Sequence, residues 1–311
     1  MTDIGMIAFD LDGTALTEEK ILTSRTHKIL ESASESGILL VPTTGRSLSG
    51  IPDVVKALSG ADYVITANGA GVYRRCAGFS YTATDKLSAN DPGFSSAAPD
   101  MPPTYDIDSS ACYELEFENL MDTGLVIRLM NELSGLSIMP DPFIEGACYI
   151  YADRVHLIDR MDVTDQMKAY IRTSRIPIAD MPAFLADKKI QKITINFIPD
   201  GNGHRTDYDK TVEILKKYPE FTAVTGGINN LEISDKKATK GDAMMRLADK
   251  LGIGRDQIIA FGDSENDNTM LKMAGTGVAM ANALESAKAA ANAVTLSNDD
   301  EGLADFLEKL L

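Results

Sequence analysis

Carboxylates gather in two short segments that lie far apart in the chain: residues 10–14, with the sequence DLDGT, and residues 262–267, with the sequence GDSEND. Each follows an apolar run, residues 4–9 and 258–261, that is typical of a buried strand. Ligands of open α/β folds bind at the carboxyl ends of parallel strands, so we expect these carboxylates at one edge of a sheet. Clustered carboxylates repel one another unless a cation lies among them. All-oxygen ligation beside a phosphate favours Mg²⁺, and the pattern predicts a Mg²⁺-dependent phosphoryl-transfer site.

Asp10 and Asp12 have the side chains and the spacing that phosphate-ester hydrolysis requires. Asp10 directly follows the strand and is the candidate nucleophile, forming an aspartyl-phosphate. Asp12, two residues later, is the candidate general acid that protonates the leaving oxygen and then the base that deprotonates water. Gly13 permits a sharp turn, in which we expect the Thr14 hydroxyl to form a hydrogen bond.

The second acidic segment supplies the remaining metal candidates. Asp263 is expected to offer a third metal oxygen, and Asp267 to ligate through water or to orient Lys240. Asn266 is a candidate donor to phosphate. The alternative is that Asp and Asn residues after strands merely cap turns and helices. That alternative is reasonable for either segment alone and poor for both together.

Four further residues are candidates for phosphate binding and charge compensation. Thr44 and Gly45 follow a second predicted strand, where a hydroxyl and exposed amides can hold a phosphate oxygen. Arg46 is a weaker candidate, because an arginine in such a turn is commonly a surface charge. Lys240 begins a predicted helix, so its ammonium and the helix N-terminus could neutralise one anion. A lysine at this end opposes the helix dipole, which suggests a functional role.

The sequence does not match the motifs of several other kinds of site. An EF-hand is excluded because its sixth and twelfth positions would be Asn268 and Ala274. The chain has no Walker A sequence. The segment 148–154 has the cysteine-to-arginine spacing of a cysteine phosphatase, but its interior is bulky and acidic. The three histidines are scattered, which argues against a histidine phosphatase or a zinc site.

Composition limits the class of protein. A length of 311 residues favours two domains. The net charge of −16 argues against nucleic acid or an anionic membrane face as a partner. The chain has no apolar stretch of membrane-spanning length and no signal-peptide pattern at its start. Its three cysteines lack metal or disulfide spacing. We therefore expect a cytoplasmic protein with no membrane partner; the sequence does not indicate its oligomeric state.

The pattern of elements predicts one α/β core that is interrupted by a second domain. Strands and helices alternate before residue 83 and after residue 236, which predicts a parallel, doubly wound sheet. Between them lie short β-like runs and helical segments typical of an α+β domain. The segment 88–104 holds four prolines, which exclude a long regular element there. We thus predict a discontinuous core, residues 1–83 and 236–311, and an inserted cap, residues 84–235.

These segments together resemble the haloacid dehalogenase superfamily, and more narrowly its Cof-type phosphatases (subfamily IIB) with a C2-type cap. The resemblance rests on the two acidic segments together with the motifs at 44–46, 68–70, 240–241, 278–283 and 297–302. It implies that Asp10 is the nucleophile and Asp12 the acid/base. Mg²⁺ would then be held by Asp10, the Asp12 carbonyl and Asp263. The implied phosphate ligands are the Leu11 and Gly45 amides, Thr44, Lys240 and Asn266.

The expected partner is a small phosphorylated metabolite, with sugar phosphates as the leading class. Two alternatives stay open at this point. A phosphomutase of the same superfamily would yield an isomer in excess of free phosphate. A non-catalytic regulator that binds phosphate or Mg²⁺ would have no need of both Asp10 and Asp12.

Overall fold

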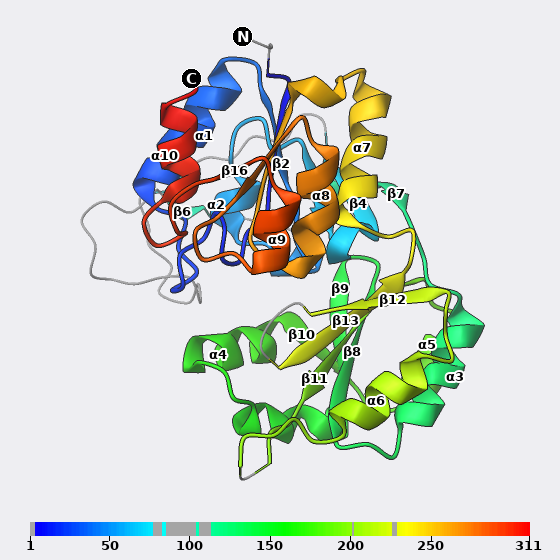
Figure 1. Ribbon diagram of the computed structural model, residues 1–311. Coiled ribbons are helices and arrows are strands. Elements are labelled where there is room, and N and C mark those ends of the chain that lie inside the picture. Colours follow the sequence, from blue (N-terminus) through cyan, green and yellow to red (C-terminus); the bar gives the residue numbers. More distant parts are fainter. Residues whose placement is uncertain (1–3, 77–82, 85–103, 106–112, 201, 226–228) are drawn as a thin grey trace. The chain divides into compact units, whose positions relative to one another are not determined.

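The computed structural model describes residues 4–76, 83–84, 104–105, 113–200, 202–225 and 229–311 (Figure 1). The chain divides into two compact units, each of which is described by itself. Unit 1 comprises residues 1–117 and 239–311, and unit 2 comprises residues 118–238. Residues 88–103 of the proline-rich segment lie outside the described residues. The domain limits 1–83 with 236–311, and 84–235, stay a prediction.

Unit 1 is built on a sheet of five parallel strands in the order β16-β15-β14-β1-β2. The central strand β14 and its neighbour β1 are apolar throughout and buried, which is typical of a parallel sheet covered on both faces. The strands are β1 (Met6–Phe9), β2 (Leu39–Pro42), β14 (Ile258–Gly262), β15 (Thr276–Ala279) and β16 (Ala293–Val294).

Two hydrophobic clusters cover the two faces of this sheet. Along β1, Ile7 and Phe9 belong to one cluster, and Met6 and Ala8 to the other, as side chains of a strand alternate. The first cluster takes in α1 (Ser24–Glu35), α9 (Glu285–Ala290) and α10 (Gly302–Glu308). The second takes in α7 (Lys240–Leu251) and much of α8 (Asn268–Met273). The predicted parallel, doubly wound core is confirmed.

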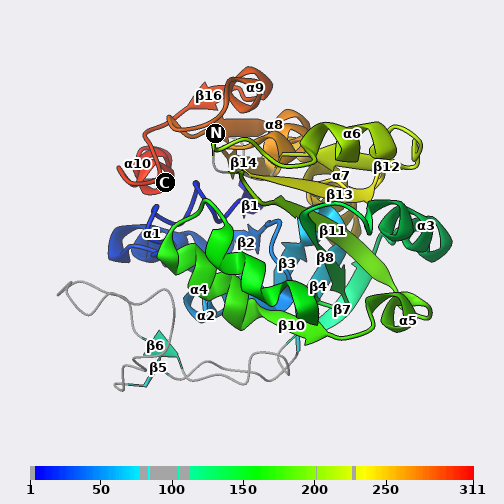
Figure 2. The ribbon, with the colours of Figure 1, turned by 90° about the horizontal axis from the view of Figure 1, so that it is seen from below.

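The first and the last helix of unit 1 lie side by side. Helix α10 lies beside α1, as Figures 1 and 2 both show. Arg25 of α1 donates from Nη2 to Glu308 of α10 at 2.7 Å, and the Thr23 hydroxyl, at the N-cap of α1, donates to Glu301 at 2.5 Å. These contacts hold the loop after β1 against the C-terminal segment.

The chain between β2 and β3 contains little helix. It has a 3₁₀ turn η1 (Leu48–Gly50) and a short α2 (Asp53–Lys56). Pro52 separates them, because proline disfavours the helical conformation of the residue before it. A small sheet follows, made of β3 (Tyr63–Thr66), β4 (Gly71–Arg75) and β7 (Tyr113–Glu118), with η2 (Ala67–Gly69) between the first two strands. β5 (Ala83–Thr84) pairs with β6 (Thr104–Tyr105).

Unit 2 contains a six-stranded, mostly antiparallel sheet in the order β10-β9-β8-β11-β13-β12. One face packs on α3 (Thr123–Leu133), α5 (Met181–Leu185) and α6 (Tyr208–Leu215). Part of the other packs on η4 (Ala152–Arg160) and α4 (Asp165–Ser174). The strands are β8 (Ile138–Ile144), β9 (Ala147–Tyr151), β10 (Arg175–Ile178), β11 (Ile190–Phe197), β12 (Phe221–Val224) and β13 (Asn230–Asp235).

Polar and charged side chains interrupt the apolar interior of unit 2. Lys192 of β11 is fully buried and contacts Glu232 of β13 at 2.6 Å. Asp141 of β8 is also fully buried; it lies 3.5 Å from the Arg175 guanidinium and accepts a 3.0 Å hydrogen bond from Asn196. Each buried carboxylate thus has a basic partner.

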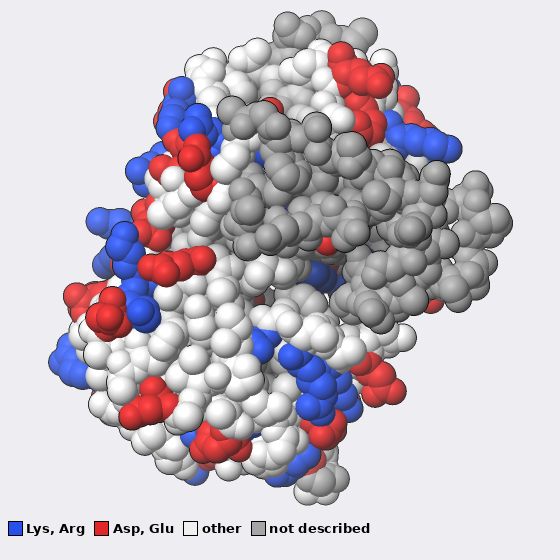
Figure 3. Space-filling model, turned by 180° about the vertical axis from the view of Figure 1, so that it is seen from behind, with Lys and Arg blue, Asp and Glu red and all other residues white. Residues whose placement is uncertain are grey.

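The surface gives no sign of a single large charged region on the face seen in Figure 3, where acidic and basic side chains of the described residues are interspersed. None of the helices in the described parts of the chain combines the length and the apolar character that a membrane crossing requires. Cys76 and Cys148 are free thiols, and Cys112 lies outside the described residues.

Candidate active site

The two acidic segments meet because their strands are neighbours. β1 and β14 pair in parallel with Phe9 opposite Phe261, so both strands end at the same edge of the sheet. The Asp10 amide continues this pairing and donates to the Phe261 carbonyl at 3.0 Å. Asp10 and Asp263 therefore emerge side by side from adjacent strands, as the sequence predicts for carboxylates at strand ends.

The turn after Asp10 is shaped by its close approach to Asp263. Gly13 has a φ of +85°, and a Cβ on this residue would lie 2.7 Å from a carboxylate oxygen of Asp263. Only glycine meets both conditions without strain. The Thr14 hydroxyl donates to Asp263 Oδ1 at 2.9 Å. The expectation that this hydroxyl bonds within its own turn was wrong, because the neighbouring strand brings a stronger, charged acceptor within reach.

Lys240 links Asp10 to Asp267. It is the first residue of α7, whose N-cap is Thr239. Its Nζ donates to Asp10 Oδ1 and to Asp267 Oδ1, both at 2.6 Å, and the ammonium is fully buried. Burial lowers the pKa of Lys240, but the two carboxylates outweigh burial and hold that pKa above its ordinary value. The lysine is therefore a permanent cation inside the site.

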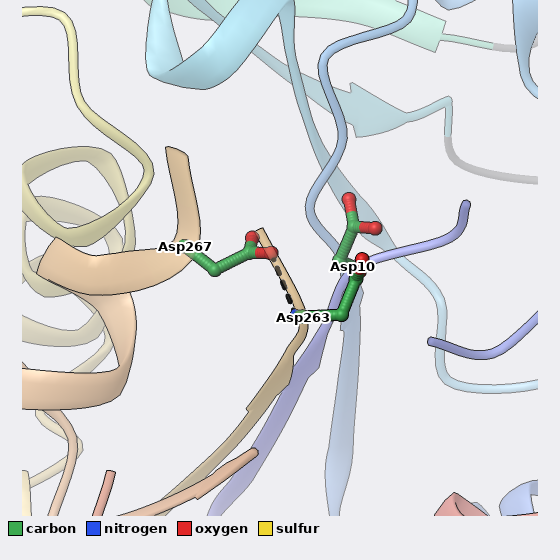
Figure 4. Close-up of side chains that lie close together, drawn as sticks. All are labelled: Asp10, Asp263 and Asp267. Carbon is green, nitrogen blue, oxygen red and sulfur yellow. Dashed lines mark hydrogen bonds between the residues drawn. The ribbon is translucent and has the colours of Figure 1, made fainter. Parts of the chain in front are cut away.

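Asp10, Asp263 and Asp267 form a group with ligand oxygens within 4.8 Å of one another. Figure 4 shows the three carboxylates converging from the ends of β1 and β14 and from η6 (Glu265–Asp267). Asp267 Oδ2 accepts from the amides of Asp263 and Ser264, each at 3.0 Å. Both oxygens of Asp267 are thus engaged by donors, which favours a role in holding Lys240 and the loop.

The electrostatics of this group call for additional positive charge. Burial raises the pKa of Asp10 well above its ordinary value; Lys240 opposes that shift, and the carboxylates of Asp267, Asp263 and Asp12 add to it. Burial and the charge of Asp267 raise the pKa of Asp263 to about 6. Three carboxylates around one ammonium leave negative charge uncompensated. The all-oxygen donors fit a hard divalent cation such as Mg²⁺.

The Asp12 side chain has different partners. Its Oδ2 accepts from Arg46 Nε and its Oδ1 from Arg46 Nη2, both at 2.7 Å, while Lys20 Nζ lies 2.9 Å from Oδ1. Burial alone would raise the pKa of Asp12, but these two cations hold it well below its ordinary value. Among the described residues, the Asp12 carboxylate is not part of the three-carboxylate group.

The other candidate residues lie around this centre with defined partners. Thr44 is buried, and its Oγ1 accepts from the Arg46 amide at 3.1 Å. Gly45 lies between these two residues, after β2. The buried Leu11 accepts at its carbonyl from the amides of Thr14 and Leu16. Asn266 donates from Nδ2 to Asn68 Oδ1 at 3.0 Å.

Two residues at the site were not assigned a role from the sequence. Lys20 reaches Asp12 from a turn eight residues later, and no spacing rule predicts that contact. Asn68 has a left-handed conformation (φ 60°) within η2 and orients Asn266. The signal for Asn68 was available, because asparagine followed by glycine marks a left-handed turn.

Comparisons with known proteins agree with this geometry. A sequence model described as haloacid dehalogenase-like hydrolase matches residues 7–91 and 110–307. Phosphatase YwpJ of Bacillus subtilis (strain 168) is 30% identical over 310 residues, which cover 98% of this chain and 99% of that protein. The 5-amino-6-(5-phospho-D-ribitylamino)uracil phosphatase YwtE of the same organism is 27% identical over 316 residues, covering 98% and 97%.

A solved structure extends the similarity to the fold. The structure of a haloacid dehalogenase-like hydrolase from B. subtilis superposes with a TM-score of 0.75 at 25% sequence identity. The superposition covers 99% of this chain and 100% of that one, so it includes the described residues of both units.

Proposed function

This chain belongs to the haloacid dehalogenase-like hydrolase family and is a phosphatase of that family, and on this premise we propose a specific reaction for it. It is a Mg²⁺-dependent phosphatase that hydrolyses a small phosphorylated metabolite through an aspartyl-phosphate. The observation that carries the proposal is the buried Lys240, which bridges Asp10 and Asp267 at 2.6 Å.

Asp10 is the proposed nucleophile. Nucleophilic attack requires the ionised carboxylate, and the Lys240 ammonium favours that form against the cost of burial. An Asp10 oxygen would bond to phosphorus while the bond from phosphorus to the ester oxygen breaks. Lys240 thus has a catalytic role as well, since it lies where negative charge develops.

Asp12 is the proposed acid and base. It would give a proton to the leaving oxygen in the first step, and in the second it would take one from the water that attacks the aspartyl-phosphate. The bond from phosphorus to Asp10 then breaks and inorganic phosphate leaves. The partners of Asp12 support a role apart from the metal ligands, because its carboxylate stands outside the three-carboxylate group. Arg46 and Lys20 lower the pKa of Asp12 and favour its ionised form, so the role that they support directly is that of the base in the second step.

Asp10 and Asp263 are the side chains proposed to bind Mg²⁺ directly, with the Asp12 backbone carbonyl as a further ligand. Asp267, whose two oxygens already accept hydrogen bonds, would contribute through a water molecule and by orienting Lys240. The bound ion would neutralise charge on the phosphoryl oxygens.

The residues proposed to bind the phosphate group are Leu11, Thr44, Gly45, Arg46, Lys240 and Asn266. Leu11 follows β1, and Thr44, Gly45 and Arg46 follow β2, which is the neighbouring strand. Asn266 follows β14, and Lys240 contacts Asp10, so all six residues are close in the fold to the ends of these adjacent strands.

We propose sugar phosphates, or phosphate esters of similar polyhydroxylated chains, as the substrate class. The name of the relative YwtE supports it, because a phosphoribityl group is a phosphate ester on a polyol chain. We also propose that residues 84–235 form the cap of the family. The folding of residues 118–238 as a compact unit supports a separate domain there.

The test is release of inorganic phosphate from a panel of sugar phosphates, phosphoribityl compounds, nucleotides, and flavin and pyridoxal phosphates. Each is assayed with Mg²⁺, with a chelator, and with Asp10→Asn. We expect metal-dependent release that falls by on the order of 10⁴-fold or more in the variant. Asp249→Asn, on the exposed side of α7, is the matched control and should keep full activity.

Three results would contradict the proposal. Phosphate release that persists with the chelator would exclude a role of Mg²⁺ in the reaction, and release that persists in Asp10→Asn would exclude Asp10 as the nucleophile. An isomer of the substrate formed in excess over free phosphate would identify a phosphomutase instead.

A further inference from the structure

The segment that follows β15 is bonded to the second acidic segment, and the proposed function assigns it no role. The Met280 amide donates to the Gly262 carbonyl at 3.1 Å. The Leu284 amide donates to the Asp263 carbonyl at 2.8 Å. These two backbone hydrogen bonds fix the chain between Met280 and Leu284 beside the end of β14, where Asp263 lies.

Between those two bonds, one side chain reaches the first acidic segment. Asn282 Nδ2 donates to the Gly13 carbonyl at 2.8 Å. Gly13 directly follows Asp12, whose carbonyl is a proposed ligand of Mg²⁺. It directly precedes Thr14, whose hydroxyl donates to Asp263 at 2.9 Å. The Asn282 side chain therefore bonds to the peptide between Gly13 and Thr14, in the turn that faces Asp263.

The Asn282 side chain is itself held in place by a second asparagine. The Asn298 amide donates to Asn282 Oδ1 at 3.1 Å, so both ends of the Asn282 amide group are engaged. Asn298 Nδ2 donates in turn to the Leu16 carbonyl at 3.0 Å. The turn after β1 is thus bonded at Gly13 to one asparagine and at Leu16 to the other.

The bond to Gly13 contributes little to the stability of the fold, because Asn282 is exposed and water can replace its partners. Its effect on a metal site can be larger. Residues that orient the ligands of a metal, without touching the metal, change its affinity by about 10–100-fold when they are removed. Asn282 has this relation to both acidic segments, since it lies on a loop bonded to one and donates to the other.

We propose that Asn282 is a positioning residue for the Mg²⁺ ligands, holding the turn of Asp12 and Gly13 against Asp263. The inference rests on the proposed function, since it concerns the ion that is proposed there. Without Asn282 the two acidic segments would no longer be held in one arrangement before the ion binds. Loss of this side chain should therefore weaken Mg²⁺ binding beyond its small effect on the fold.

The experiment measures the Kd for Mg²⁺ from the rise of the thermal unfolding midpoint with Mg²⁺ concentration, a readout that does not depend on catalysis. Asn282→Ala removes both hydrogen bonds of the side chain. Asn292→Ala is the matched control. Asn292 is also exposed and follows β15, but its Oδ1 accepts from the Gly277 amide at 2.8 Å, within β15 and on neither acidic segment.

We expect Asn282→Ala to raise the Kd for Mg²⁺ by about tenfold and Asn292→Ala to leave it within about twofold of the unmutated value. With a chelator present, both variants should lower the unfolding midpoint by a similar small amount, on the order of 2 °C. A residue with a merely structural role would change that midpoint and leave the Kd unaltered.

An unchanged Kd in Asn282→Ala, or an equal rise of the Kd in Asn292→Ala, would overturn the role of Asn282 and leave the proposed function intact. If Mg²⁺ did not stabilise the unmutated protein at all, the proposed Mg²⁺ dependence would be refuted and this inference with it.

Discussion

Each of the two units buries a group of charged side chains, and the two groups differ in the balance of positive and negative charge. In unit 2, Lys192 pairs with Glu232 and Arg175 with Asp141, so two cations meet two carboxylates. In unit 1, Asp10, Asp263 and Asp267 lie together, and the single ammonium of Lys240 contacts Asp10 and Asp267.

The difference separates a structural network from a site. Buried charges are tolerated when they are paired, and the group in unit 2 needs nothing from outside the protein. The group in unit 1 has three carboxylates and one ammonium, so it retains negative charge that Lys240 cannot neutralise alone. Beyond the effect of burial, the charges of Asp267 and Asp263 raise the pKa of Asp10 further. Such a group stays incomplete until a cation binds. The account therefore predicts opposite responses to metal ions in the two units.

The largest effect on stability is expected in unit 2. Lys192→Met leaves Glu232 buried without its basic partner, and should lower the free energy of unfolding by about 3–5 kcal/mol. The chain contains no tryptophan, so urea unfolding would be followed by far-ultraviolet circular dichroism. The double variant Lys192→Met/Glu232→Met should recover most of the loss. A single variant as stable as the unmutated protein would show that the pair is not needed for the fold.

Loss of the lysine in unit 1 should act mainly on catalysis. Lys240→Met keeps the length of the side chain and removes the charge that faces Asp10. We expect kcat/KM for the best panel substrate to fall by on the order of 10²–10³-fold, as for loss of a donor to developing charge. Mg²⁺ should partly restore the stability of this variant but not that of Lys192→Met. An unchanged kcat/KM would exclude Lys240 from the reaction.

A smaller effect, on the pH dependence of the free energy of unfolding, is expected from the titration of Asp141 in unit 2. Burial, opposed by Arg175 and Asn196, raises the pKa of Asp141 to about 6, above its unfolded value of about 3.9. The folded state therefore binds a proton that the unfolded state releases, and stability is lost as pH rises from about 4 through about 6. The loss is about 3 kcal/mol, from about 1.4 kcal/mol per pKa unit.

Asp141→Asn removes this titration, so the measurement is the difference in unfolding free energy between the unmutated protein and the variant across pH 4–8. The difference should fall through the acidic range and be flat above about pH 7. A difference that is flat throughout, or that rises with pH, would contradict the assignment of a raised pKa to Asp141.

The sequence predicts the centre of the site better than its surroundings. Asp10 and Asp263 follow apolar runs whose strands pair in parallel, and strand ends of one sheet meet at one edge. The partner of Arg46 was not predictable, because its guanidinium reaches Asp12 only through the conformation of the loop after β2. The contact between Lys20 and Asp12 likewise depends on the left-handed backbone of Lys20 itself, in a turn that has no glycine to indicate that conformation. Contacts set by loop conformation leave little trace in residue spacing.

The central claim is that the three-carboxylate group of unit 1 binds a divalent cation and that the balanced group of unit 2 does not. The most direct measurement is thermal and urea unfolding with increasing Mg²⁺ for the unmutated protein, Asp263→Asn and Asp141→Asn. We expect stabilisation of about 2.7 kcal/mol at a Mg²⁺ concentration of about 100 times the Kd, lost in Asp263→Asn and retained in Asp141→Asn. No stabilisation of the unmutated protein, or the same stabilisation in Asp263→Asn, would contradict the account.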